Sequence, residues 1–463
     1  MTESVFQDLP RGWRKVPLEC LILRMSNGLT KRQTKDGRGF AVSRIETISQ
    51  GVVDFSRVGY LPDLSPSEIE NYRLRDGDIL FSHINSDYHL GKTAVVSPNG
   101  STLLHGMNLL LIRVDQEKVL PRFLHWFFNY YRLGGFFMSI AQHAVNQSSI
   151  NQAKLKGVPI LLPPVDEQRE IVAEIEKQFT RLEAGVAGLR RVQAKLKRYR
   201  AAVLKAACEG KLVPTEAALA RQEGRTYETG AQLLERILTE RRQKWNGKGK
   251  YKEPTMPDPA ALPEPPDGWT WIELGQLAWS VKDGPHYSPE YVKDGVPFIT
   301  GGNVRPTGVD FENAKRISRE LHAELSKRCK PEYGDILYTK GGTTGIARVN
   351  TYDEEFNVWV HVAVLKLVHS VEPFFVQHML NSPLAYAQAQ RFTHGVGNQD
   401  LGLTRMVHIR FPLPPLVEQS RIVAEVDLRL SVVEELEAVA NANLQRTNRL
   451  RQSILQRTFE PTL

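Results

Sequence analysis

The stretch Leu162-Pro-Pro-Val-Asp-Glu-Gln-Arg-Glu-Ile-Val-Ala-Glu174 returns as Leu413-Pro-Pro-Leu-Val-Glu-Gln-Ser-Arg-Ile-Val-Ala-Glu425, 251 residues later (413 − 162). The same spacing separates His143 from His394. Self-similarity at a fixed spacing is the mark of a duplicated architecture. The chain therefore reads as two copies of one structural unit.

Upstream of these stretches the two copies match more loosely. Gly77-Asp-Ile-Leu80 corresponds to Gly334-Asp-Ile-Leu337, at a spacing of 257 (334 − 77), and Gly91 corresponds to Gly345, at 254 (345 − 91). A spacing that drifts indicates loop insertions and deletions. Each copy thus combines a variable lobe with a segment that tolerates no gaps.

The gap-free segments predict two long helices, over 162–212 and 413–463. Pro163-Pro164 restricts the entry to the first, and Asp166 is its expected N-cap. Apolar residues recur at alternating spacings of three and four, which is the pattern of a coiled-coil contact. Because the nearest partner for each stripe is its own repeat, we expect the helices to pair with each other. The residues expected to pair them are Ile175, Phe179, Leu182, Leu189, Leu196, Val203, Val426, Leu430, Val433, Ala440, Leu444 and Ile454.

The lobes, over 1–161 and 266–412, are expected to be α/β (α+β). Short β-rich runs predict strands, and two longer segments predict helices. The aromatic cluster Trp126-Phe127-Phe128 is interpreted as core. Between the helix of the first copy and the second lobe, the segment 213–265 is expected to be a linker with a short helix capped by Thr229 and Gln232, followed by a proline-rich spacer. The predicted strands are 78–82, 93–96, 109–114 and 362–368, and the predicted helices are 123–131 and 373–390.

Composition narrows the class of protein. The 463 residues are 41% hydrophobic and carry a formal net charge of +8, which favours polyanionic partners. The three cysteines form no metal-binding pattern. The N-terminus has no secretory pattern, and no apolar run approaches the ~18 residues of a membrane helix. We expect a cytoplasmic protein without a membrane partner.

Motifs for catalysis were sought and not found. Gly91-Lys92-Thr93 resembles the end of a phosphate-binding loop, but Ser86 stands where that motif needs glycine. The Pro-Pro doublets are flanked by Leu and Val or Leu, unlike an amino-methyltransferase motif, and no hydrolase or zinc motif occurs. We therefore expect no catalytic residue, no metal and no cofactor. Two alternatives stay open at this point: a DNA methyltransferase or nuclease in its own right, and a coiled-coil adaptor that binds only proteins.

The chain resembles, over essentially its whole length, the specificity subunit of type I restriction–modification systems. The resemblance lies in the paired Leu-Pro-Pro-x-x-Glu-Gln-x-x-Ile-Val-Ala-Glu helix starts, the repeated Gly-Asp-Ile-Leu and Cys208-Glu-Gly-Lys-Leu-Val213. The resemblance implies two target recognition domains, each reading half of a split site on double-stranded DNA. It also implies an antiparallel coiled coil that spaces them and docks two methyltransferase subunits, which bind S-adenosylmethionine and methylate adenine. A translocating endonuclease subunit completes the complex implied by the family.

Candidate DNA contacts lie in loops rich in residues that read base edges or bind phosphate. One set follows Gly-Asp-Ile-Leu in each lobe, a second precedes each long helix, and a third is a basic loop early in the first lobe. The candidates are Lys31, Arg32, Lys35, Arg38, Ser82, His83, Asn85, Lys92, Asn146 and Gln147 in the first lobe, and Lys340, Thr343, Thr344, Arg348, Asn398 and Gln399 in the second.

Overall fold

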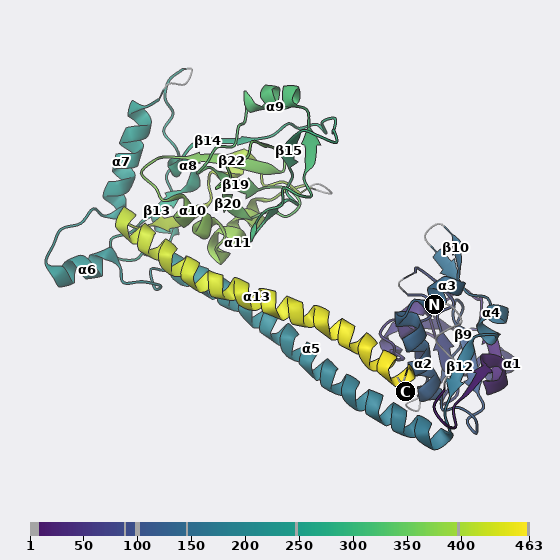
Figure 1. Cartoon of the computed structure of the whole chain (residues 1–463). Helices are drawn as coiled ribbons and strands as arrows, with labels where there is room; N and C mark the ends of the chain where they lie inside the picture. The colour runs from purple at the N-terminus through teal and green to yellow at the C-terminus, as the bar shows by residue number, and fades with distance from the viewer. Residues whose placement is uncertain are drawn as a thin grey trace. The chain divides into compact units, whose positions relative to one another are not determined.

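The computed structural model describes residues 9–87, 89–97, 102–144, 147–245, 249–395 and 399–460. The chain divides into two compact units, one formed by 1–191 with 440–463 and the other by 192–439. Each unit contains one lobe and parts of two 44-residue helices, α5 (Val165–Cys208) and α13 (Leu416–Phe459) (Figure 1).

The first lobe is built on a four-stranded antiparallel sheet in the order β2-β9-β5-β7. Alternate residues of β5 enter two cores, because successive side chains of a strand point to opposite faces. Ile79 and Phe81 pack with the aromatic side chains of helix α2, whereas Leu80 packs with Ile48 and Val58. The bounds are β2 (Ile22–Asn27), β9 (Leu110–Val114), β5 (Ile79–Phe81), β7 (Thr93–Val95) and α2 (Pro121–Leu133).

Smaller elements surround this sheet. A three-stranded sheet has the order β4-β3-β8, a second has the order β10-β11-β6, and β1 pairs with β12. Their bounds are β1 (Arg14–Pro17), β3 (Phe40–Val42), β4 (Gly59–Leu61), β6 (Ile84–Asn85), β8 (Leu103–Leu104), β10 (Gln142–Ala144), β11 (Gln147–Ser149) and β12 (Pro159–Leu162). The remaining helices are α1 (Pro66–Tyr72), α3 (Phe136–Ile140) and α4 (Gln152–Lys156).

The second lobe repeats the strand orders of the four-stranded sheet, of the β4-β3-β8 sheet and of the β1-β12 pair. Its four-stranded sheet is β14-β22-β19-β20, a three-stranded sheet is β18-β15-β21, β13 pairs with β23, and β16 pairs with β17. The strands are β13 (Thr270–Glu273), β14 (Ala278–Asp283), β15 (Val296–Ile299), β16 (Val304–Arg305), β17 (Gly308–Val309), β18 (Lys315–Ile317), β19 (Ile336–Thr339), β20 (Ala347–Val349), β21 (Asn357–Val358), β22 (Val362–Leu367) and β23 (Arg410–Leu413). The helices are α8 (Leu274–Leu277), α9 (Arg319–Ser326), α10 (Pro373–Leu380), α11 (Pro383–Phe392) and α12 (Leu403–Met406).

Most predicted elements are confirmed, with two corrections. The four predicted strands correspond to β5, β7, β9 and β22, and Phe127 and Phe128 are fully buried. The single helix predicted over 373–390 is wrong: α10 ends at Leu380, and Ser382 caps a new helix that starts at Pro383, whose ring cannot donate a helical hydrogen bond. The expected cap at Asp166 is also wrong, because α5 already begins at Val165.

Helices α5 and α13 pair in an antiparallel sense within each unit. In the first unit, Glu183 of α5 forms an ion pair with Arg451 of α13. In the second unit, Arg200 of α5 lies 3.6 Å from Glu434 and 3.5 Å from Glu437 of α13. Higher residue numbers in α5 therefore meet lower numbers in α13. Figure 1 shows the two ribbons running side by side inside each unit.

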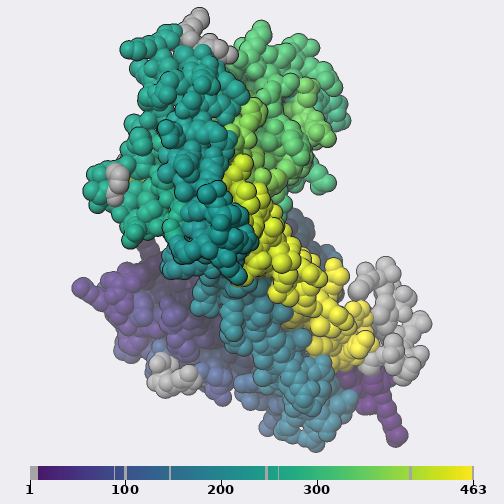
Figure 2. Space-filling model, turned by 90° about the vertical axis from the view of Figure 1, so that its left-hand side faces the viewer, coloured from purple at the N-terminus to yellow at the C-terminus, as the bar shows by residue number. Residues whose placement is uncertain are grey.

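The segment that follows α5 belongs to the second unit. It contains α6 (Glu216–Glu223) and α7 (Gly230–Gln243), and the predicted capping box of α7 is confirmed by hydrogen bonds between Thr229 and Gln232. Leu233 and Ile237 are fully buried in the core that also holds Leu274 of the lobe. Figure 2 shows this segment, in teal, against the green lobe and the first turns of α13.

Candidate nucleic-acid interface

Three chain segments meet at one edge of each four-stranded sheet. In the first lobe, β2 and β5 end where β9 begins, since Asn27 and Phe81 both pair with Leu110. In the second lobe, β14 and β19 end where β22 begins. We call this edge the loop edge of a lobe. It gathers the loops after β2, after β5 and before β9, or their counterparts after β14, after β19 and before β22.

At the loop edge of the first lobe, two sets of sequence candidates come together. Strand β11 pairs with β6, which places Ser148 opposite Asn85 and brings Gln147 beside the loop after β5. The Asn85 amide donates to the Ser82 hydroxyl at 3.1 Å, and the Ile150 amide donates to the His83 carbonyl at 2.9 Å. The loop after β5 is therefore tied to the segment before the long helix.

The second lobe joins the equivalent segments by a different chemistry. The Lys340 ammonium lies 2.7 Å from Asp400 and 3.4 Å from Asp283, and only 3% of its side chain is exposed. The Leu401 amide donates to the Lys340 carbonyl at 2.8 Å. A buried ammonium held by two carboxylates is an ion-pair link within the lobe, because breaking such a pair costs several kcal/mol of folding stability.

The other candidates differ in exposure. Ser82 and Thr344 are buried, whereas Thr343 is exposed and donates to the Gly301 carbonyl at 3.2 Å. Arg348 lies in β20 opposite Leu337 and donates to the Pro306 carbonyl at 3.0 Å. Gln147 and Gln399 are exposed. Asn146 and Asn398 lie outside the described residues.

The basic loop of the first lobe faces solvent. Arg32, Lys35 and Arg38 are exposed, and Lys31 forms an ion pair of 2.6 Å with Glu68. Lys92, at the far end of the loop after β5, donates to the Ser49 carbonyl at 3.0 Å. The charges of the 31–38 loop are thus available to an anion, since exposed cations pair with phosphate readily.

The first lobe contains two buried histidines, His105 and His125, and a half-buried one, His83. Burial lowers the pKa values of His83, His105 and His125 to about 4, because desolvation disfavours the imidazolium. His125 is hydrogen-bonded to the Thr93 hydroxyl at 2.9 Å, and His105 to the Leu109 carbonyl at 3.1 Å. These imidazoles are neutral at pH 7, and the rings of His105 and His125 are polar links inside the lobe.

The repeated Glu-Gln pair explains why the helix starts tolerate no gaps. The Trp13 indole donates to Glu167 at 2.8 Å, and the Trp269 indole donates to Glu418 at 2.9 Å. Gln168, the residue after Glu167, binds the segment ahead of α2: the Leu120 amide donates to its side chain at 2.8 Å. We call each such arrangement, from the tryptophan to the glutamine, a helix joint.

The second helix joint follows the same plan. The Glu372 amide, ahead of α10, donates to the Gln419 side chain at 3.1 Å, and Gln419 donates to the Pro414 carbonyl at 3.0 Å. Gln168 likewise donates to the Pro163 carbonyl, at 2.9 Å. Each motif residue therefore fixes a lobe to the helix that follows it.

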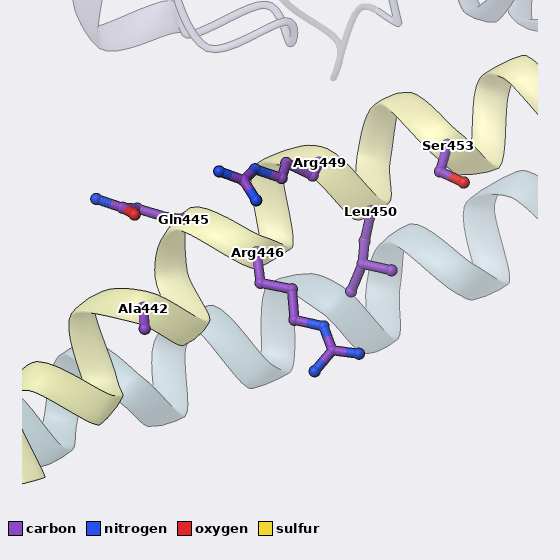
Figure 3. Close-up of a pocket in the computed structure, with 6 residues that line it drawn as sticks. All are labelled: Ala442, Gln445, Arg446, Arg449, Leu450 and Ser453. Carbon is purple, nitrogen blue, oxygen red and sulfur yellow. The ribbon is translucent and has the colours of Figure 1, made fainter.

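The twelve residues predicted to pair the long helices are all buried or half-buried in their units. Leu455 and Phe459, which the sequence pattern did not single out, are buried against α2 of the first unit. On the surface of the same unit, α13 lines a hollow of about 510 Å³ with Arg446, Arg449 and Leu450. Figure 3 shows Arg446 and Leu450 directed toward the neighbouring helix and Arg449 directed away.

The described part of the chain has neither a metal-binding cluster nor a membrane-spanning helix. No group of three or more His, Cys, Asp or Glu side chains there could hold a metal ion. None of the described helices is long and apolar enough to cross a membrane.

Comparison with known proteins agrees with this geometry. The model of the type I restriction modification DNA specificity domain matches residues 34–186 and again 266–435. The chain belongs to this family. The two matches cover both lobes and the beginnings of both long helices, so the specificity-domain family accounts for the duplication.

Relatives in the specificity-subunit family match along nearly the full length. The chain is 28% identical to the MjaX specificity subunit of Methanocaldococcus jannaschii, over 97% of this chain and 93% of that protein. It is 23% identical to the EcoBI specificity subunit of Escherichia coli, over 98% and 86%. A solved structure described as showing complex assembly and conformational transition of the type I R-M system has a TM-score of 0.62 at 21% identity, over 98% of this chain and all of that one.

Sequence reasoning missed several residues at the loop edges. Met107 and Asn108 are exposed beside the basic loop, and Asp283 and Asp400 hold Lys340. The His-Gly-Met-Asn connection between two apolar runs was a readable signal, because Gly and Asn mark tight turns. The role of the two aspartates had no local signal, since they lie 117 residues apart (400 − 283).

Proposed function

We propose that this chain is the DNA-reading subunit of a type I restriction–modification complex, recognising an asymmetric two-part site with one lobe on each half. The observation that carries the proposal is that both lobes have the same strand order and the same loop edge but different side chains there. Ahead of β9 and of its counterpart β22, Asn108 stands in the first lobe where His361 stands in the second, each two residues before the paired Leu110 or Ala363. Different side chains in one framework read different bases.

The long helices are proposed to set the distance between the two half-sites. Each helix has 44 residues, which corresponds to about 66 Å at ~1.5 Å per residue. Pairing in both units supports a stiff spacer, because packing of its apolar face supplies most of a helix's stability. Half-sites read from one side of a duplex lie about one or more helical turns apart.

One face of α13 is proposed to dock a methyltransferase subunit. Leu428, Val432, Leu436 and Val439 follow each other at helical spacing, and their exposed fractions are 63%, 51%, 46% and 51%. A contiguous exposed apolar stripe of this kind marks a protein interface. At the repeat spacing of 251 the corresponding residues of α5 are Lys177, Arg181, Gly185 and Gly188, so any second docking face on α5 has a different chemistry.

In this proposal the chain performs no chemistry. Methyl transfer to adenine, with S-adenosylmethionine, belongs to two bound methyltransferase subunits, and cleavage belongs to translocating endonuclease subunits. The solved relative described in terms of complex assembly supports a role within an assembly. The rival in which the chain is itself a methyltransferase predicts methyl transfer by the purified chain, and the protein-only adaptor predicts no DNA footprint.

The test is to map methylated adenines in cells that express the methyltransferase subunits with and without this chain. A split motif that appears only with the chain supports the proposal. Exchange of residues 1–160 for the first lobe of a relative should then change one half of the motif and leave the other intact. A swap that alters both halves, or neither, would refute the two-reader model.

A second test addresses the spacer. Because Glu183 faces Arg451, Leu189 of α5 faces Gln445 of α13, six residues along each helix in opposite directions. Seven residues inserted after both positions keep the coiled-coil phase and add ~10 Å, or about three base pairs of rise. We expect the gap between half-sites to grow, or binding to be lost because the second groove also rotates. Full methylation of the original site would rule out the spacer role.

A further inference from the structure

The segment His105–Leu109 joins β8 to β9 at the loop edge of the first lobe, and close backbone packing fixes its course. A Cβ atom on Gly106 would lie 1.9 Å from the Ser43 carbonyl oxygen, and one on Gly28 would lie 2.1 Å from the Gly106 oxygen. The Leu29 amide also donates to the His105 carbonyl at 2.9 Å. Only glycine permits this approach, so the segment is rigid before any ligand arrives.

Asn108 holds a backbone conformation that non-glycine residues rarely adopt. Its φ is +67°, and within the described residues it is the one non-glycine side chain with positive φ. Asparagine tolerates this left-handed region better than most residues. The buried hydrogen bond from the His105 ring to the Leu109 carbonyl holds both ends of the turn. Backbone strain maintained in this way is concentrated at binding sites.

The turn presents its side chains to a surface hollow of about 540 Å³. Met107 and Asn108 line this hollow together with Arg32, Arg44 and Glu46. Met107 is 38% exposed, so its side chain is accessible at this hollow. The Gln33 side chain packs on Gly106, so the basic loop that carries Arg32 is fastened to the turn.

We propose that Asn108 reads an A·T base pair of the first half-site in the major groove, with Met107 packed beside the base edge and Arg32 on a neighbouring phosphate. This inference rests on the proposed function. The amide of asparagine offers one donor and one acceptor, which match N6 and N7 of adenine. The rigid turn holds that amide in place, while the adjacent cation supplies the contact that sets register but not sequence.

The second lobe supports a reading role for this position. His361 is the equivalent of Asn108. Asn108 stands two residues before Leu110, which pairs with Phe81. His361 stands two residues before Ala363, which pairs with Tyr338. Gly284 packs on the Val358 carbonyl as Gly28 packs on Gly106. The framework is the same and the side chain at this position differs, since His361 is half-buried with its ring against Gly341, whereas Asn108 is exposed.

The test compares methylated motifs made by complexes of the wild-type chain and of two variants. Asn108→Gly keeps the left-handed backbone and removes the amide, while Asn108→Asp keeps the shape and leaves only acceptors, which favours a C·G pair. We expect Asn108→Gly to accept other bases at one position of one half-site, with discrimination falling roughly 5- to 150-fold. Asn71→Ala, on the exposed face of α1, is the control and should leave the motif unchanged.

The possible outcomes separate the inference about Asn108 from the proposed function. A wild-type chain that directs no split motif removes the proposed function and this inference together. A wild-type motif that both Asn108 variants preserve at full efficiency removes only the inference. A loss that is equal on all sequences shows a backbone or folding role and also overturns it. If Asn108→Gly lowers the yield of folded complex, the Asn108→Asp motif decides, because a change confined to one position still identifies a base contact.

Discussion

Replacing Glu418 by alanine should destabilise the second unit far more than the equivalent change at Glu167 destabilises the first. Glu418 is fully buried and accepts hydrogen bonds from the Trp269 indole at 2.9 Å and from the Glu216 amide at 2.8 Å. Its removal leaves two buried donors unsatisfied, at about 1–3 kcal/mol each. Burial raises the pKa of Glu418, so losing the carboxylate returns part of that cost, and we expect a net loss of about 2–4 kcal/mol.

Glu167 provides the matched control. It is half-buried and accepts one hydrogen bond, from the Trp13 indole at 2.8 Å, and water can replace that bond. We therefore expect Glu167→Ala to cost less than about 1 kcal/mol. Because a chain of two units need not unfold in one step, the assay is hydrogen exchange followed separately at the start of each long helix. Equal losses at the two starts, or a larger loss for Glu167→Ala, would refute this account of the helix joint.

Three further outcomes are expected. The first lobe should lose stability as the pH falls from about 6.5 toward 4. His125 is neutral when folded, with a pKa of about 4, and takes up a proton when unfolded, so it contributes up to about 1.4 kcal/mol per pH unit to the slope. Urea titrations of His125→Gln should show a shallower slope, with the contributions of His83 and His105 remaining. If Arg348 reads a base, Arg348→Ala should cost ~1–3 kcal/mol of DNA-binding free energy and relax the base preference at one position of the second half-site. Lys35→Ala should instead weaken binding to all sequences alike and lower the slope of log affinity against log salt concentration by about one. Identical, sequence-blind losses of affinity in filter binding would make Arg348 a phosphate contact. Leu428→Glu should remove one of two methyltransferase subunits in native mass spectrometry, and a complex that keeps both would show that the exposed stripe docks neither.

The duplication and the long helices could be predicted because both leave periodic signals along the chain. A repeat of 251 residues and an apolar stripe at helical spacing need no tertiary information. The break between α10 and α11 also had a signal, Ser382-Pro383, which the apolar pattern obscured. These features depend on neighbours in sequence.

The chemistry of the loop edges was harder to predict from the sequence, because it depends on contacts between residues that are far apart in the chain. Lys340 looked like a DNA contact, yet its ammonium lies between Asp283 and Asp400, far away in sequence. Asn108 was not among the sequence candidates, and its exposure beside Arg32 follows only from the packing of Gly106. A side chain's availability is a property of the folded lobe and not of its own segment.

The helix joint also bears on how such a chain can evolve. Gln168 is hydrogen-bonded to the Leu120 amide and the Lys118 carbonyl of the first lobe. Gln419 is hydrogen-bonded to the Glu372 amide of the second. Most of what each glutamine contacts is therefore main chain. Main-chain groups survive any substitution except proline at the amide. A lobe can therefore accumulate mutations, or be replaced wholesale by recombination, without loss of its attachment. If the lobes read DNA as proposed, variation in what is recognised is thereby separated from the assembly that acts on it, and a new target can arise in a single genetic exchange.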